Sequence, residues 1–230
     1  MLEAINLSKV YDEHHALNHL NLSVVRGEVF CLLGQNGAGK TTTINLFLGL
    51  IEPTEGKAMV DGQEVGKRNA TNESIAYIPE VVQLYGNMNG IENLDFFSRV
   101  AGFKYTKMEL RSLLQKVGLK EEHHSKKLSS YSKGMRQKVG IAIALSKNAK
   151  VIFMDEPTSG LDPKATDEFT SLCKELAAED KTLFMATHDI FNAVGVGTQI
   201  GIMKEGELIH TTQTNGLQAE ELQQLYLKSI

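Results

Sequence analysis

The residues from Gly34 to Thr41 read Gly-Gln-Asn-Gly-Ala-Gly-Lys-Thr, which matches the phosphate-loop pattern G-x-x-x-x-G-K-[ST]. In such a loop, the glycines let successive backbone N–H groups point at phosphate oxygens, and the helix that begins there adds its positive end. We expect Lys40 to reach the β- and γ-phosphates and the Thr41 hydroxyl to ligate Mg²⁺. The predicted nucleotide-binding residues of this loop are Gly34, Gln35, Asn36, Gly37, Ala38, Gly39, Lys40, Thr41 and Thr42.

Two other interpretations of this glycine-rich segment are weaker. A dinucleotide-binding turn has the order G-x-G-x-x-G, whereas Gly34, Gly37 and Gly39 give G-x-x-G-x-G, so nicotinamide chemistry is disfavoured. A tight turn before a helix is the plain structural alternative. The full pattern, however, arises by chance in only on the order of 1% of chains of this length. The segment therefore favours a nucleoside triphosphate.

Two adjacent acids, Asp155 and Glu156, follow the apolar run from Val151 to Met154. A buried strand that ends in two acids places them where open α/β sheets bind ligands, although solvated acids at a strand end are the alternative. We expect Asp155 to support Mg²⁺ together with Thr41, and Glu156 to take a proton from the attacking water. Because two carboxylates would repel the nucleotide, the pair itself requires a cation, which predicts Mg²⁺ as cofactor.

The pattern of apolar residues predicts the elements that position these groups. Strands are expected at 2–11, 20–25, 28–33, 58–60, 75–78, 151–154 and 182–186, with two short strands around Glu205-Gly206, and helices at 40–51, 163–178 and 217–227. This alternation predicts an α/β fold, a P-loop NTPase core with a mostly parallel sheet, flanking helices and an N-terminal antiparallel β portion. Residues 1–85 and 148–230 would form the core, and residues 86–147, whose apolar residues recur at helical spacing, an inserted helical lobe.

Length and composition exclude several classes of protein. The chain has 230 residues, with 24 Lys and Arg against 28 Asp and Glu, so its net charge of −4 argues against non-specific binding to nucleic acid. Its longest apolar stretches fall far below the roughly 18 residues of a membrane-spanning helix. With only Cys31 and Cys173, a reducing compartment fits. We expect a chain that does not cross a membrane by itself.

Three further segments carry a family resemblance. The signature segment, residues 128–138 (Leu-Ser-Ser-Tyr-Ser-Lys-Gly-Met-Arg-Gln-Lys), precedes the two acids, Ser159-Gly160-Leu161-Asp162 follows them, and Thr187-His188-Asp189 comes after the last core strand. Together with the phosphate loop, these segments resemble the ATP-binding-cassette (ABC) ATPases over nearly the whole chain. The resemblance implies ATP as the nucleotide and active sites that are completed when two copies close over two ATP molecules.

The resemblance also implies roles for individual residues. Tyr11 falls where the family stacks an aromatic ring on adenine, and His188 where a histidine holds the γ-phosphate and the water. Catalysis is then expected from Glu156, His188 and Lys40. The residues expected to contact the ATP of the opposite subunit, or to shape the interface with it, are Ser132, Lys133, Gly134 and Asp162.

Two segments depart from the commonest family pattern. The signature segment carries Tyr131, Lys133 and Met135 where that pattern has leucine, glycine and glutamine, and Glu80 stands where it usually has a glutamine that touches Mg²⁺. Because glutamate keeps an oxygen ligand and adds a charge, Glu80 joins Thr41 and Asp155 as a predicted metal ligand. Both departures are similar to the bacterial exporter branch, in which the ATPase and membrane subunits are separate polypeptides.

The resemblance thus implies the ATP-binding and hydrolysing subunit of an ABC transporter, which couples dimer closure to transport, with export favoured. The implied partners are a second ATPase subunit, expected to be an identical copy, and an integral membrane subunit. The implied location is cytoplasmic, at the inner face of the cell membrane. The alternative is a soluble ABC ATPase of DNA repair or translation. A nucleotide kinase would not explain the signature segment or His188, and the transported compound is not encoded in this chain.

Two histidine-containing tetrads, 12–15 and 121–124, suggest a metal site. Neighbouring side chains diverge on a strand or a helix, so each tetrad offers a partial ligand set. We expect both tetrads to be solvated loops.

Overall fold

The computed structural model describes residues 1–66 and 74–229 of the chain. Its strands are β1 (Leu2–Tyr11), β2 (His14–Val24), β3 (Val29–Leu33), β4 (Glu55–Val60), β5 (Gln63–Glu64), β6 (Ile75–Ile78), β7 (Val151–Asp155), β8 (Thr182–Thr187), β9 (Gln199–Lys204) and β10 (Glu207–Gln213). Its helices are α1 (Lys40–Phe47), α2 (Gly90–Val100), α3 (Lys107–Lys116), α4 (Lys133–Ser146), α5 (Pro163–Ala178), α6 (Ile190–Val196) and α7 (Ala219–Ser229).

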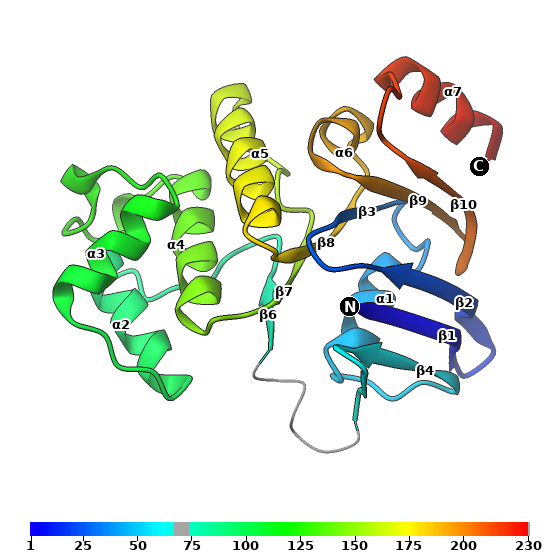
Figure 1. Cartoon of the computed structure of the whole chain (residues 1–230), viewed down its shortest axis with the longest axis horizontal. Helices are drawn as coiled ribbons and strands as arrows, with labels where there is room; N and C mark the ends of the chain where they lie inside the picture. Colours follow the sequence, from blue (N-terminus) through cyan, green and yellow to red (C-terminus); the bar gives the residue numbers. More distant parts are fainter. Residues whose placement is uncertain (67–73, 230) are drawn as a thin grey trace.

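The strands form two sheets (Figure 1). The larger sheet has the order β10-β9-β3-β8-β7-β6, in which β10 pairs antiparallel with β9 and the other pairs are parallel. The smaller sheet, β2-β1-β4-β5, is antiparallel throughout. The predicted α/β fold, with a mostly parallel sheet, flanking helices and an N-terminal antiparallel portion, is therefore confirmed.

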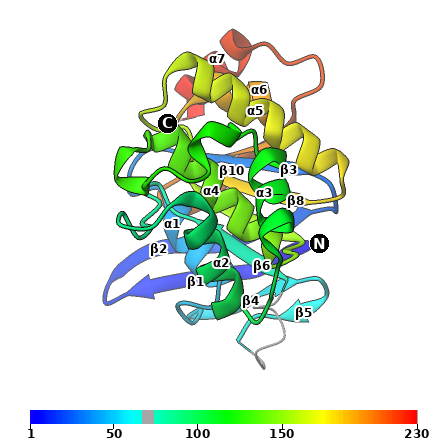
Figure 2. The same cartoon turned by 90° about the vertical axis from the view of Figure 1, so that its left-hand side faces the viewer.

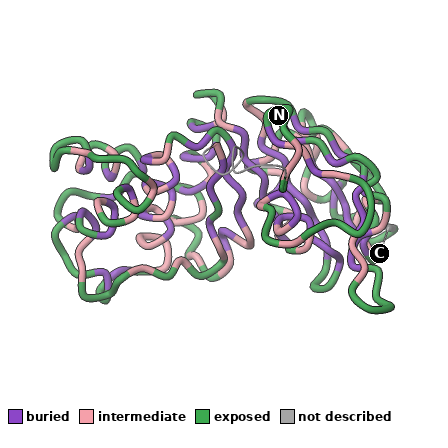
Figure 3. Tube along the Cα trace, turned by 90° about the horizontal axis from the view of Figure 1, so that it is seen from below, coloured by how far each residue is buried: buried purple, intermediate pink, exposed green. Residues whose placement is uncertain are grey.

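Strand β3 lies between two apolar cores because its side chains alternate between the two faces of the larger sheet. Phe30 and Leu32 face a core that contains α1 and the antiparallel sheet. Val29, Cys31 and Leu33 face the other core, which contains α5 and α6. All five residues are buried, and Figure 3 shows buried segments inside the molecule with exposed segments at its edges. This double packing holds the phosphate loop, which begins where β3 ends.

The segment 86–147 lies at one end of the molecule and contains α2, α3 and α4 (Figures 1 and 2). Helices α2 and α3 each begin with a capping box, in which side chain and backbone N–H groups at the helix start satisfy each other. One apolar cluster joins Leu94 and Leu110 of this segment to Ile78 and Ile152 of the larger sheet. The segment therefore shares a buried core with the sheet, while its exact bounds as a lobe remain a prediction.

Several element bounds differ from the sequence-based expectation. Strand β2 begins at His14, not at residue 20, because it pairs with β1 from the Tyr11–His14 partners onward. Helix α1 ends at Phe47, not at residue 51, because Gly49 adopts a φ of 69°. The two strands around residues 205 and 206 are longer than expected, and both turn residues have positive φ, as a tight hairpin turn requires.

The expectation that both histidine tetrads are solvated loops is correct only in part, because residues 12–15 are all exposed but residues 121–124 are not. His14 and His15 are exposed but lie on β2, and His124 is only 1% exposed, with its Nε2 2.8 Å from the Leu119 carbonyl oxygen. Within residues 1–66 and 74–229, no cluster of three or more His, Cys, Asp or Glu side chains is arranged to hold a metal ion. In the same ranges, no helix has the length and apolar character to span a bilayer.

Candidate functional site

The phosphate loop connects β3 to α1 and is fixed by backbone hydrogen bonds. The Ala38 N–H donates to the Gln35 carbonyl at 3.1 Å, and the Gly206 N–H donates to the Ala38 carbonyl at 2.9 Å. Gly39 is the N-cap residue of α1, with a φ of 106°. A Cβ atom on Gly39 would lie 2.5 Å from the Ala16 carbonyl oxygen, so this position requires glycine. The loop thus has the strand–loop–helix setting that its sequence pattern predicts.

Lys40 is the first residue of α1, and only 6% of it is exposed. Its Nζ donates to the Gly34 carbonyl at 2.7 Å and to the Gln35 carbonyl at 3.2 Å, and it lies 3.7 Å from Glu156 Oε1. A buried ammonium needs such partners because burial of an unpaired charge is costly. The contacts place a fixed positive charge inside the loop, where phosphate oxygens can replace the carbonyl groups.

Thr41 connects the loop to the end of β7, because its Oγ1 donates to Asp155 Oδ2 at 2.9 Å. Burial raises the pKa of Asp155 above its ordinary value; Glu156 and Glu80 add to the rise, while the Thr41 hydrogen bond and Lys40 oppose it. Carboxylates that raise one another's pKa favour a bound cation. Thr41, Asp155 and Glu80 offer the hard oxygen donors that Mg²⁺ prefers, so these residues fit a magnesium ion.

Glu156 follows β7 and has a left-handed φ of 43°. Its Oε2 lies 2.9 Å from His188 Nδ1 and accepts hydrogen bonds from the Thr187 hydroxyl and the His188 N–H at 3.3 and 3.4 Å. Its Oε1 is buried and, in the described part of the chain, accepts no hydrogen bond. One carboxylate oxygen is therefore held by the end of β8, and the other is buried 3.7 Å from Lys40 Nζ without a hydrogen-bond donor.

The loop and the acids line one cavity of about 410 Å³. Tyr11 lies at its side and is 43% exposed, with the Lys9 ammonium 5.0 Å from the centre of its ring. The predicted residues that line this cavity are Tyr11, Gln35, Asn36, Gly37, Gly39, Lys40, Thr41, Thr42, Glu80, Asp155 and Glu156. Gly34 and Ala38 are buried residues of the same loop, and His188 reaches the site through Glu156.

Ser132, Gly134 and Asp162 lie apart from this cavity and line a second hollow of about 170 Å³. Ser132 Oγ accepts from the N–H of Met135 at 3.3 Å, and Asp162 Oδ1 accepts from the N–H of Ala165 at 2.9 Å. Each side chain therefore caps the first turn of a helix, α4 or α5. A single chain does not bring these residues onto its own phosphate loop.

The sequence analysis missed three residues of this region. Ser159 Oγ donates to Glu80 Oε1 at 2.9 Å, and His14 and Ala16 line the 410 Å³ cavity. The position of Ser159 just after the two acids was visible in the sequence, but its partner depends on how the ends of β6 and β7 lie together. His14 and Ala16 were missed because β2 begins earlier than expected.

These features define an ATPase cassette, and comparison with known proteins agrees. Residues 17–159 match the family model described as ABC transporter. The bacitracin transport ATP-binding protein BcrA of Bacillus licheniformis is 36% identical to the chain, over 91% of the chain and 68% of BcrA. The lantibiotic transport ATP-binding protein SrtF of Streptococcus pyogenes is 31% identical, over 100% of the chain and 97% of SrtF.

A solved structure gives the same result. The chain resembles the ATP-binding cassette MJ0796 in a dimeric post-hydrolysis state bound to ADP and Pi, with a TM-score of 0.81, 28% identity, and coverage of 94% of this chain and 100% of that one. The chain therefore belongs to the ABC transporter family. It is an ATP-hydrolysing, ATP-binding subunit of a transporter, and the alternative of a soluble ABC ATPase in repair or translation is not favoured.

Proposed function

We propose that ATP binds in the 410 Å³ cavity and is hydrolysed there. In this proposal, Lys40 and the N–H groups of the phosphate loop hold the phosphates, and Tyr11 stacks on the adenine ring. The observation that carries the proposal is the convergence on one cavity of Lys40, the Thr41–Asp155 hydrogen bond and the carboxylate of Glu156.

The proposed chemistry is in-line attack of water on the γ-phosphorus, with the bond to the ADP oxygen breaking. Mg²⁺ held by Thr41, Asp155 and Glu80 would offset the negative charge of the phosphates. Glu156 Oε1 accepts the proton of the attacking water, while His188 and Thr187 hold Oε2 in place. The His188 side chain is 62% exposed, so in this proposal its ring, held by Glu156 through Nδ1, can present Nε2 to the γ-phosphate.

We propose that two identical chains share the two active sites. Ser132 and Gly134 at the start of α4 line a different hollow from the chain's own phosphate loop, and the positive end of that helix suits the γ-phosphate of a facing copy. Lys133 would add its charge to this contact, and Asp162 would shape the interface. The relationship to a dimeric cassette structure supports this arrangement.

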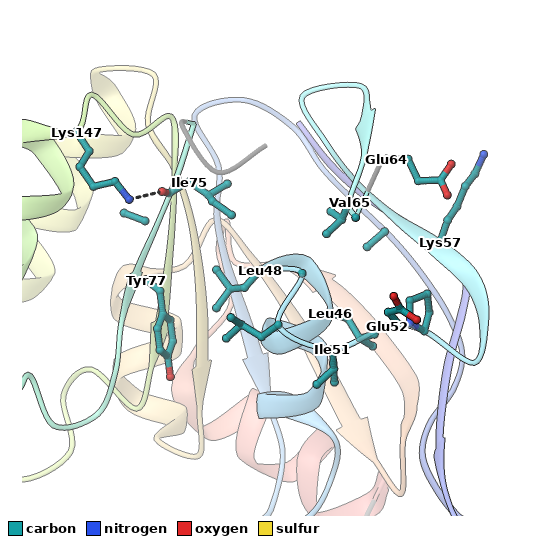
Figure 4. A pocket seen from close by; sticks show the side chains of 16 residues that line it. Leu46, Leu48, Ile51, Glu52, Lys57, Glu64, Val65, Ile75, Tyr77 and Lys147 are labelled. Carbon is teal, nitrogen blue, oxygen red and sulfur yellow. Dashed lines mark hydrogen bonds between the residues drawn. The ribbon is translucent and has the colours of Figure 1, made fainter. Parts of the chain in front are cut away.

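We further propose that an integral membrane subunit docks on two adjoining hollows that lie across the core and the lobe. One hollow, of about 710 Å³, is lined by Leu50 and Tyr77 among others (Figure 4). The other, of about 440 Å³, is lined by Tyr77, Val100 and Phe103. Leu50 and Val100 are 66% and 71% exposed, and apolar side chains exposed around a hollow are typical of a protein-binding surface.

The relatives named for bacitracin and lantibiotic transport support a transporter of the exporter branch. We therefore propose export as the direction of transport and the inner face of the cell membrane as the site of action.

The central test is the variant Glu156→Gln. It should bind ATP, hydrolyse it roughly 10²- to 10⁴-fold more slowly, and accumulate as a closed dimer in size-exclusion chromatography. Unchanged turnover would remove Glu156 as the base. Ser132→Arg should abolish hydrolysis and spare ATP binding by the monomer, whereas Ser125→Arg, an exposed change on the same lobe, should do neither. Full-rate hydrolysis by a strictly monomeric sample would refute the shared site.

The docking surface has a separate test. Val100→Glu should reduce co-purification with the membrane subunit, because it places a charge in the apolar hollow. Met108→Glu is the matched control, since Met108 is 78% exposed and lines neither hollow. Equal co-purification of both variants with the membrane subunit would refute the surface.

A further inference from the structure

Two of the residues that depart from the commonest family pattern, Lys133 and Glu80, contact each other. Lys133, the first residue of α4, has its Nζ 3.8 Å from Oε1 of Glu80, which follows β6. The same Oε1 accepts a hydrogen bond from the Ser159 hydroxyl at 2.9 Å. The Glu80 carboxylate therefore connects the first turn of α4 to the loop that follows the two acids. A glycine and a glutamine at these positions would offer neither of the two charges.

The two charged groups face different nucleotides in the proposed dimer. Glu80 lines the cavity that contains the chain's own phosphate loop, together with Thr41 and Asp155. Lys133 lies between Ser132 and Gly134, which would contact the ATP held by the other copy. One ion pair within a single chain thus joins a group of one active site to a group of the other.

The pair is weak enough for bound nucleotide to separate it. The Lys133 and Glu80 side chains are 33% and 52% exposed, and ion pairs of this exposure are strongly screened by water. A cation bound beside Thr41 and Asp155 would attract Glu80, and a triphosphate would attract Lys133 more strongly than one carboxylate does. The two attractions pull Glu80 and Lys133 in opposite directions and so favour separation of the ion pair.

We propose that Lys133 and Glu80 couple the two ATP sites of the dimer. In the nucleotide-free chain, Glu80 holds Lys133. When Mg²⁺ and nucleotide occupy the chain's own site, Glu80 turns toward the cation and Lys133 is released to the γ-phosphate in the other site. Coupling of this kind is reciprocal, so ATP in either site favours ATP in the other. Lys133 is here a positioning residue for Glu80 and a ligand of the second ATP, and the inference rests on the proposed dimer.

The release of Lys133 can be measured without hydrolysis. Amine acetylation followed by mass spectrometry would report the labelling rate of Lys133 in the monomeric full chain, with and without Mg²⁺–ADP. We expect the rate to rise several-fold on addition of Mg²⁺–ADP in the wild type, and to be high under both conditions in Glu80→Gln. Lys127, an exposed lysine of the same lobe, is the internal control and should not change. An unchanged Lys133 rate in the wild type, or a low rate in nucleotide-free Glu80→Gln, would overturn the proposal.

The coupling itself needs a second measurement. We would measure how tightly the dimer binds a non-hydrolysable ATP analogue at its second site once the first site is occupied. This second-site affinity should be about two- to fivefold higher in the wild type than in Lys133→Ala, which is the size of effect that one exposed ion pair gives. Lys133→Arg should restore the wild-type affinity of the second site. The double variant Glu80→Gln/Lys133→Ala should have the same second-site affinity as Lys133→Ala alone. Additive effects in the double variant, or wild-type coupling in Lys133→Ala, would refute the coupling. If the wild-type chain neither binds the analogue nor dimerises, the proposed function fails instead.

Discussion

Alanine substitution of two glycines in the phosphate loop distinguishes the energetic cost of a steric clash from the cost of a positive φ. Gly37 has a φ of 85° and open space where a Cβ would stand. Gly39 has a φ of 106°, and its Cβ would lie 2.5 Å from the Ala16 carbonyl oxygen and 3.3 Å from Met203 Sδ. The Ala16 oxygen belongs to the backbone of β2, which cannot move without disturbing the antiparallel sheet. Both positions are therefore unfavourable for alanine, but only Gly39 also meets a clash.

The expected magnitudes follow from these contacts. A left-handed conformation costs a non-glycine residue about 1–2 kcal/mol, and overpacking adds about 1–3 kcal/mol. Gly37→Ala should therefore lower the free energy of unfolding by about 1–2 kcal/mol from the conformational cost alone. Gly39→Ala carries both costs, so its thermal midpoint should fall below that of Gly37→Ala by roughly 2–12 °C.

Calorimetry of both variants, with and without ATP, would test this reasoning. Gly39→Ala should also lose the increase in midpoint that ATP gives the wild type, because the first turn of α1 is displaced. Gly37→Ala, with no clash, should keep most of it. A midpoint for Gly37→Ala equal to or below that of Gly39→Ala would contradict the structure of the loop.

Three other predictions use the pKa shifts of buried or paired groups. Burial raises the pKa of Cys31 to about 12 and that of Cys173 well above its ordinary value, so both thiols should react with Ellman's reagent only after unfolding. Asp155→Asn should weaken Mg²⁺-dependent ATP binding at least about tenfold. In the wild type, fluorescence titration should show that ATP binding weakens as the pH falls toward the raised pKa of Asp155. The Lys138 hydrogen bond lowers the pKa of Glu168, so its stabilising effect should be present above pH 4.5 and disappear as the pH falls through the lowered pKa. Urea unfolding of Glu168→Gln should accordingly show a weaker acid dependence than the wild type.

Features encoded in short runs of sequence could be predicted, and features that depend on distant segments could not. The phosphate loop is a continuous run whose glycines, lysine and threonine specify their own local geometry, and the two acids follow a strand of clear apolar character. The contact between Glu80 and Lys133 joins the end of a strand to the start of a helix in the inserted segment. No local pattern shows that these two residues meet.

The errors of prediction have the same physical origin. The first half of β2, His-His-Ala-Leu-Asn-His, has its two apolar residues, Ala16 and Leu17, next to each other and both buried, so its pairing with β1 leaves no alternation of apolar residues to detect. His124 lies in a run of eight polar residues, 120–127, and it is buried because the turn that carries it packs against other parts of the helical segment. In both cases tertiary contacts decide the structure where the local sequence suggests a loop.

The helical segment enters from β6 and returns to β7, and these two strands are hydrogen-bonded neighbours of the larger sheet. Because the two strands are parallel, the segment leaves at the carboxyl end of β6 and returns at the amino end of β7, so its two attachments lie at opposite ends of the strand pair and a turn of the segment would be about the line that joins them. Helix α4 lies beside the attachment strands and α3 lies farther out (Figure 1). A small rearrangement near Glu80 and Lys133 would move α3 through a wider arc than it moves α4, so chemistry at the nucleotide would produce its largest displacement at the outer end of the molecule.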